Sequence, residues 1–189
     1  MSKTQIVSGG ITDGTIATAD ISDDAVTAAK VTGLGKVAQI VQTVKKDTFS
    51  GSPSSFSDIT GMSVSITPSA TSSKILVTAQ ISYGGSQNTY GHIRILRGST
   101  SVCVGDAGES SQTRATFPTS TSSEPDQYKC YNAVLEHLDS PSSSSSTTYK
   151  LQLYVHGDPV VYINRPENNS NNDYIGRYTS SITAMEILA

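Results

Sequence analysis

The first part of the chain carries one aliphatic side chain at every fifth position, and small, polar or acidic residues fill the intervals. A period of five matches neither the roughly 3.6 residues of a helical turn nor the period of about two of a β-strand. Such a segment acquires a hydrophobic interior only when neighbouring turns or identical chains supply the other walls. We therefore predict that residues 1–35 form an extended stalk, and that its trimer core consists of Ile6, Ile11, Ile16, Ile21, Val26 and Val31.

Residues 23–31 also have a composition that favours helix, with Asp23 and Asp24 suited to a first helical turn. A short helix here competes with continuation of the five-residue repeat, and the sequence leaves both interpretations open. Gly33 and Gly35 then interrupt the pattern and predict a hinge.

From residue 36 onward, hydrophobic and polar residues alternate with a period of two, which predicts β-strands separated by Ser-, Gly- and Pro-rich loops. No helix is needed to explain this part, so we predict an all-β jelly-roll sandwich, and we call residues 36–189 the head. The expected strands cover residues 37–45, 62–67, 74–82, 92–98, 102–104, 130–138, 150–157, 159–165 and 180–189.

Two of these strands, residues 159–163 and 182–188, are apolar on both faces. An antiparallel sandwich normally buries only one face of each strand, so the second face needs a partner. The chain also has no Trp and only 3 Phe, which predicts a thin core in a single copy. Both features predict burial against identical copies around a threefold axis.

Composition narrows the choice of partners. The net charge of −3 is unsuited to neutralising phosphates, so no nucleic-acid partner is expected. No apolar run approaches the roughly 20 residues of a membrane span, so no membrane partner is expected. Cys103 and Cys130 have no spacing typical of a metal site, and the sequence leaves open whether they pair.

The chain offers little that indicates catalysis. The acidic residues Asp13, Asp20, Asp23 and Asp24 lie on the predicted stalk rather than across a cleft. The three histidines have no nearby metal-ligating partner in the sequence, although a threefold axis can gather three copies of one histidine. We expect no catalytic residue, cofactor or metal, and hence no enzyme.

Two polar loops are candidates for recognition, because loops on a rigid sandwich are where binding residues tend to lie. The first spans residues 105–127 and contains Arg114, with Tyr128 following it. The second spans residues 167–173 and is suited to sugar or calcium. Its candidate residues are Asn168, Asn169, Asn171, Asn172, Asp173 and the adjoining Tyr174.

Seven segments in order resemble small virion structural proteins, often called tail-fibre-like, from phages of aquatic bacteria. The segments are GKVAQIVQTVKKDTFS, FSDITGMSVSITPSATSSKILV, IRILRGST, VGDAGESSQTRATFP, LDSPSSSSSTTYKLQ, VYINRPEN and SSITAMEIL. The segment ITDGTIATADISDDAVTAAK is similar to connectors repeated in phage fibres. The resemblance implies a homotrimer whose head is similar to the jelly rolls of tumour-necrosis-factor or complement type.

We therefore expect a non-enzymatic protein on the virion surface, either a fibre or spike or a capsid decoration (head fibre or cement) protein. Its partners would be itself and other capsid or tail proteins, contacted through the N-terminal segment. One alternative is a receptor-binding tail fibre that recognises a host surface glycan. Another is a cell-encoded trimeric sugar-binding module.

Overall fold

The computed structural model describes residues 19, 21–22, 36–109, 111–121 and 127–188. The chain divides into two units, Met1–Gly35 and Lys36–Ala189. Ile21 is exposed. The other five residues of the predicted stalk core lie outside the described residues, as do the alternative helix and the hinge. The stalk therefore stays a prediction.

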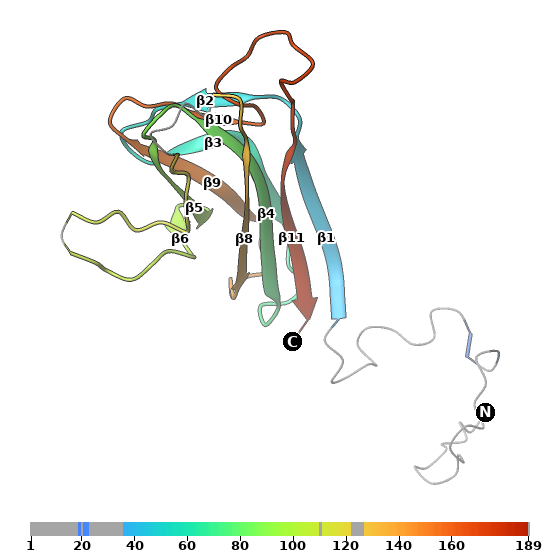
Figure 1. Cartoon of the computed structure of the whole chain (residues 1–189). Helices are drawn as coiled ribbons and strands as arrows, with labels where there is room; N and C mark the ends of the chain where they lie inside the picture. Colours follow the sequence, from blue (N-terminus) through green and yellow to red (C-terminus); the bar gives the residue numbers. More distant parts are fainter. Residues whose placement is uncertain (1–18, 20, 23–35, 110, 122–126, 189) are drawn as a thin grey trace, which may run out of the picture. The chain divides into compact units, whose positions relative to one another are not determined.

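Eleven strands make up the described part of the head (Figure 1). They are β1 (Lys36–Lys45), β2 (Phe49–Gly51), β3 (Ser57–Ile66), β4 (Lys74–Gly85), β5 (Tyr90–Arg97), β6 (Thr100–Ser101), β7 (Phe117–Pro118), β8 (Tyr131–Asp139), β9 (Thr147–His156), β10 (Val161–Ile163) and β11 (Ser180–Leu188).

The strands form two antiparallel sheets. Sheet A has the order β1-β11-β4-β8, and the short β10 continues from the far end of β4 to β2. Sheet B has the order β3-β9-β5, and both β6 and β7 pair with β5. Along the chain, successive strands change repeatedly from one sheet to the other, which is the wrapping of a jelly roll. The predicted all-β jelly-roll sandwich is confirmed.

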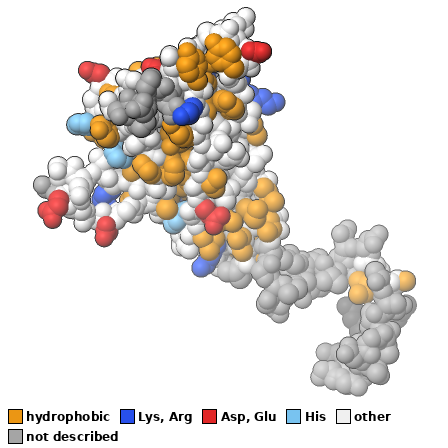
Figure 2. Space-filling view, viewed as in Figure 1, with side chains coloured by type: hydrophobic (Ala, Val, Ile, Leu, Met, Phe, Trp, Pro, Cys, Tyr) orange, Lys and Arg blue, Asp and Glu red, His pale blue; other side chains and the backbone are white. Residues whose placement is uncertain are grey.

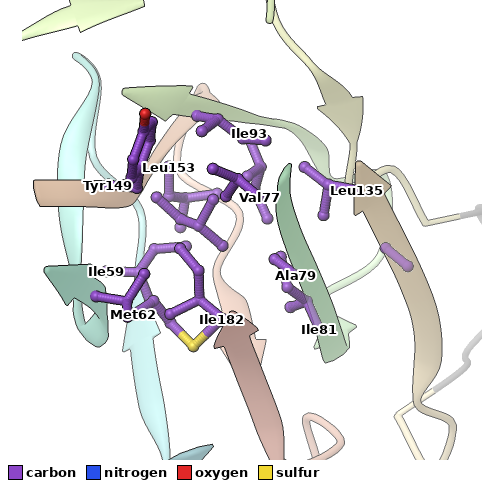
Figure 3. Close-up of a cluster of buried hydrophobic side chains, with 14 of the residues drawn as sticks. Ile59, Met62, Val77, Ala79, Ile81, Ile93, Leu135, Tyr149, Leu153 and Ile182 are labelled. Carbon is purple, nitrogen blue, oxygen red and sulfur yellow. The ribbon is translucent and has the colours of Figure 1, made fainter. Parts of the chain in front are cut away.

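The core lies between the sheets and is built from alternate residues of each long strand. Figure 3 shows Val77 from sheet A near Ile93 and Leu153 from sheet B, and Ile182 from sheet A near Met62 from sheet B. The predicted inward alternation of β4, β5 and β9 is confirmed, because every second residue of these strands is buried. The predicted thin core is wrong. Aliphatic side chains and Tyr149 fill the interior of one copy without Trp.

One charged cluster joins the two sheets. Arg97 on β5 donates to both carboxylate oxygens of Asp139 on β8, each at 2.8 Å. The Tyr149 hydroxyl on β9 donates to the same carboxylate at 2.6 Å. Burial and the neighbouring Asp139 raise the pKa of Tyr149, so this hydroxyl keeps its proton. The Asp139 carboxylate therefore has hydrogen-bond partners from β5 and β9, and these bonds link sheet A to sheet B.

Three short strands differ from the sequence prediction. The strand expected at residues 102–104 is wrong, since β6 covers Thr100–Ser101 only. β2 and β7 lie within segments that were expected to be loops. Both β6 and β7 pair with β5, at opposite ends of the same edge, so neither can extend along it.

Candidate interaction surfaces

The outer face of sheet A carries a continuous row of hydrophobic side chains. In the strand register, Ile40 on β1 lies opposite Met185 on β11, Met185 opposite Leu76 on β4, and Leu76 opposite Leu138 on β8. Side chains opposite each other on one face of a sheet lie about 5 Å apart and contact each other. Val37 on β1 and Ile187 on β11 form the next pair on this face, toward the C-terminal end of β11. We call these six side chains the apolar band.

The apolar band is open to solvent in a single copy. Ile40 is 58% exposed and Leu138 is 49% exposed, while Leu76, Met185 and Ile187 are half-buried. Figure 2 shows hydrophobic side chains gathered over the ends of β1 and β11. The outer face of an antiparallel sheet is normally polar when it meets water. A connected apolar row in that position indicates a contact surface.

The next row of the same face is polar, which limits the apolar band to one end of the sheet. Gln42, Thr183, Thr78 and Glu136 follow one another across β1, β11, β4 and β8. The Gln42 amide donates to the Thr183 hydroxyl at 2.9 Å. Each polar position in this row lies two residues along its strand from a position of the apolar band and can therefore serve as a control for substitutions there.

The two strands predicted to be apolar on both faces differ in what covers their outer face. β11 places Ile182 and Ala184 in the core and Met185 outward, as predicted. In β10, the outward residue is Tyr162, and the guanidinium of Arg165 lies 4.0 Å from its ring centre. The second face of β10 is therefore covered by this chain's own arginine.

The predicted recognition loop near residues 167–173 uses most of its amides to hold its own shape. The side-chain oxygen of Asn168 (Oδ1) accepts from the backbone N–H and the hydroxyl of Ser170. Asn172 donates to the Ser170 hydroxyl and to the Tyr174 hydroxyl. Asn169 accepts from Arg177. Hydrogen bonds of this kind, from Asn side chains to neighbouring residues, stabilise the turn itself.

Two exposed tyrosines lie beside that loop. Tyr174 is 64% exposed and Tyr128 is 47% exposed. Their rings meet edge to face with centres 5.9 Å apart, so the structure brings together residues 46 positions apart in sequence. Asn171 and Asp173 are also exposed on the same loop.

Arg114 lies away from the Tyr128–Tyr174 pair. It lies on the loop that leaves β6 and returns to β7, and its Nε donates to the Gly105 carbonyl at 2.7 Å. Figure 1 shows this yellow-green loop projecting from the β5–β6 edge, away from the orange-red loop that precedes β11. The predicted recognition residues therefore fall into two groups.

The described residues were compared with the requirements of a metal site and of a reactive thiol. There, no three His, Cys, Asp or Glu side chains are grouped so that they could hold a metal ion. Cys103 and Cys130 are both free thiols. Burial raises the pKa of Cys130 to about 11, although Arg165 opposes the shift, so this thiol is protonated at neutral pH. Among the described residues, no helix has the length and apolar character to cross a membrane.

Comparison with solved structures gives only a distant likeness. No protein-family model matches the sequence, and no curated protein matches it. Among solved structures, the chain aligns with one described as the structure of infectious bursal disease virus Gx strain, with a TM-score of 0.39 and 11% sequence identity. The alignment covers 79% of this chain and 38% of that chain. The strand order described above, rather than this alignment, establishes the fold.

The sequence analysis missed the apolar band as a set. A signal was present in β1, where Ile40 and Val44 are apolar on the face opposite Val41, whereas Val37 reaches that face only through the register shift between Val37 and Gln39. Leu138 on β8 gave no signal by itself, because one exposed leucine is ordinary on a protein surface. Only the pairing of four distant strands connects these side chains.

Proposed function

We propose that this protein is a non-enzymatic structural protein of a bacteriophage particle. Three copies of the head close against each other through the apolar band of sheet A, and the polar row beside it stays outside the contact. Residues 1–35 form the stalk and contact capsid or tail proteins, which places the protein on the virion surface. The jelly-roll fold and the resemblance of the seven sequence segments to small virion proteins support this proposal.

The apolar band is the observation that carries the proposal. Each 100 Å² of apolar surface removed from water contributes about 2.5 kcal/mol. The band offers six neighbouring hydrophobic side chains on one face, so its burial between copies favours association. Because the core of one copy is already closed, this outer face, and not an incomplete interior, drives assembly.

Matched substitutions on β1 test the interface. We expect Ile40→Lys to raise the dissociation constant of the trimer about 30-fold or more, the effect of losing an interface residue worth about 2 kcal/mol. Gln42→Lys is the control, because it adds the same charge two residues along the same face. Sedimentation equilibrium should give about three chains for the wild type and for Gln42→Lys. A wild-type monomer, or an Ile40→Lys variant with unchanged assembly, would contradict the proposal.

Two placements on the particle agree with this assembly. A capsid decoration or cement protein clamps neighbouring capsid subunits, whereas a fibre or spike projects from the tail. Imaging of intact particles with an antibody against the head distinguishes them, since the label lies on the capsid in the first case and on the tail in the second.

A second candidate function is recognition of a host surface glycan by a receptor-binding tail fibre. The exposed Tyr128–Tyr174 pair favours it, because tyrosine combines a flat apolar face with a polar hydroxyl. A cell-encoded trimeric sugar-binding module would present the same pair. Phage structural genes next to the coding sequence would favour the virion proposal over that module.

A further inference from the structure

A hollow of about 330 Å³ lies at the edge of sheet B, apart from the apolar band and from the Tyr128–Tyr174 pair. Its lining comes from His92 on β5 and from residues 105, 106, 108 and 112–118. This volume is at the small end of the range for ligand pockets, and it suits one ring-sized group better than a long chain.

One wall of the hollow is aromatic and apolar. It contains His92, Phe117 and Pro118. The His92 ring stacks on Tyr154 with centres 5.7 Å apart and an interplanar angle of 12°, and Phe56 packs against the same tyrosine at 5.6 Å. Burial lowers the pKa of His92, and the nearby His156 adds to this effect, so the ring is neutral at pH 7.

The other wall is polar and contains both hydrogen-bond donors and acceptors. It includes Asp106, Gln112, Thr113 and Arg114. Arg114 and Asp106 are exposed. Within the part of the chain that the structure describes, the Arg114 side chain makes its hydrogen bond through Nε, which leaves its two terminal nitrogens for a ligand.

The polar wall is held in place before any ligand arrives. The backbone N–H of Thr116 donates to the Ile93 carbonyl of β5 at 2.8 Å, and that of Gly105 donates to the Ala115 carbonyl at 3.2 Å. The Gln112 side chain accepts from the backbone N–H of Glu109 at 2.9 Å. These contacts hold the residues next to β5 in place, so a ligand that contacts them would lose little free energy in ordering them.

We propose that this hollow binds a sugar ring of a glycan. A pyranose has an apolar C–H face, which fits the His92 and Pro118 wall, and a rim of hydroxyls that donate and accept, which fits Asp106 and Arg114. A small anion would meet the Asp106 carboxylate, and a cation would meet the Arg114 guanidinium. A wholly apolar ligand would make no hydrogen bond with either charged group.

Nuclear magnetic resonance titration of the full chain with sugars tests this inference. The probes are the methyl α-glycosides of glucose, galactose, mannose and N-acetylglucosamine, added while the imidazole signals of His92 are followed. At least one glycoside should shift these signals in a saturable way. Arg114→Gln and Asp106→Asn should each weaken binding about tenfold, the loss expected for one charged hydrogen bond.

Variants of the other recognition loop supply the matched controls. Arg177→Gln removes a guanidinium, and Tyr174→Ala removes an exposed ring, and neither should change binding in the hollow. The inference is overturned if no glycoside shifts His92, if Tyr174→Ala rather than Arg114→Gln abolishes binding, or if inorganic phosphate binds and the glycosides do not.

The same samples separate this inference from the proposed assembly. Sedimentation of each variant reports the number of chains independently of sugar binding. A monomer that still binds a glycoside would contradict the trimer and leave the hollow as a sugar site. If Arg114→Gln breaks the trimer and no glycoside binds, the hollow is an interface between copies instead.

Discussion

Glu186 is a fully buried carboxylate on the core side of β11. Its oxygens accept from the backbone N–H and the hydroxyl of Ser69, both at 2.7 Å, and from the Gln39 amide at 2.6 Å. Burial alone would raise the pKa, but the hydrogen bonds from Ser69 and Gln39 outweigh it and lower the pKa to about 2. The charge therefore ties β1 and the loop before β4 to β11.

This residue gives the head a defined acid sensitivity. The unfolded chain takes up the Glu186 proton near pH 4.5, whereas the folded chain holds the carboxylate ionised down to about pH 2. The stabilisation is complete above the higher value and is lost as the pH falls through the lower one. The two pKa values correspond to roughly 3 kcal/mol at neutral pH.

We expect Glu186→Gln to lower the free energy of unfolding at pH 7 and to flatten its decline between pH 4.5 and 2. The introduced amide would also place a donor against the Gln39 amide. Urea unfolding across this pH range measures both effects. Glu109→Gln, in an exposed loop, is the control and should keep the wild-type slope. Parallel curves for Glu186→Gln and the wild type would contradict the assignment.

At the scale of elements, the alternating pattern predicted the long strands well. β1, β4, β5, β8, β9 and β11 all lie where alternation of hydrophobic and polar residues placed them. The short strands β2 and β7 escaped prediction because two or three residues cannot show a period of two. β7 also contains Pro118, which normally argues against a strand and is tolerated at the sheet edge.

Gly84 shows why β4 can lie so close to the segment after β10. A Cβ added there would stand 2.9 Å from the Arg165 carbonyl oxygen and 2.9 Å from the Pro166 Cα. Both neighbours are backbone atoms, so relief requires the segment itself to move. Gly84 therefore permits the close approach of two chain segments that are far apart in sequence.

We expect Gly84→Ala to lower the free energy of unfolding by about 1–3 kcal/mol, the usual cost of overpacking a well-packed region. Gly105→Ala is the matched control, because a Cβ at Gly105 meets nothing within 4 Å, and it should change stability by less than about 0.5 kcal/mol. Thermal and urea unfolding provide the measurement. Equal stabilities of the two variants would show that the close approach is not limiting.

At the scale of the whole molecule, the five-residue repeat and the apolar band give separate contributions to the proposed trimer. The repeat lies in residues 1–35, and the band lies on the outer face of sheet A. If both act, damage to either one weakens association without unfolding the head, because the core of the head is complete in one copy.

We expect Ile16→Asp to weaken trimer formation while the head stays folded, because the charge would enter the predicted stalk interior. Thr15→Asp is the control, since it places the same charge at a position between the aliphatic residues. Sedimentation measures the association, and far-ultraviolet circular dichroism reports on the strands. Unchanged sedimentation of Ile16→Asp would remove the stalk from the account of assembly.

The amino-acid pattern was enough to predict the all-β class, the long strands and their inward faces, because alternation is a local property of each strand. Polar composition pointed to the loops around Arg114 and Tyr174, but the folded chain was needed to show that they form two separate surfaces. The apolar band, the Glu186 contacts and the hollow beside His92 were likewise decided by the fold. Each depends on which distant strands become neighbours and in which register, and pairing between distant segments leaves no periodic trace in the sequence.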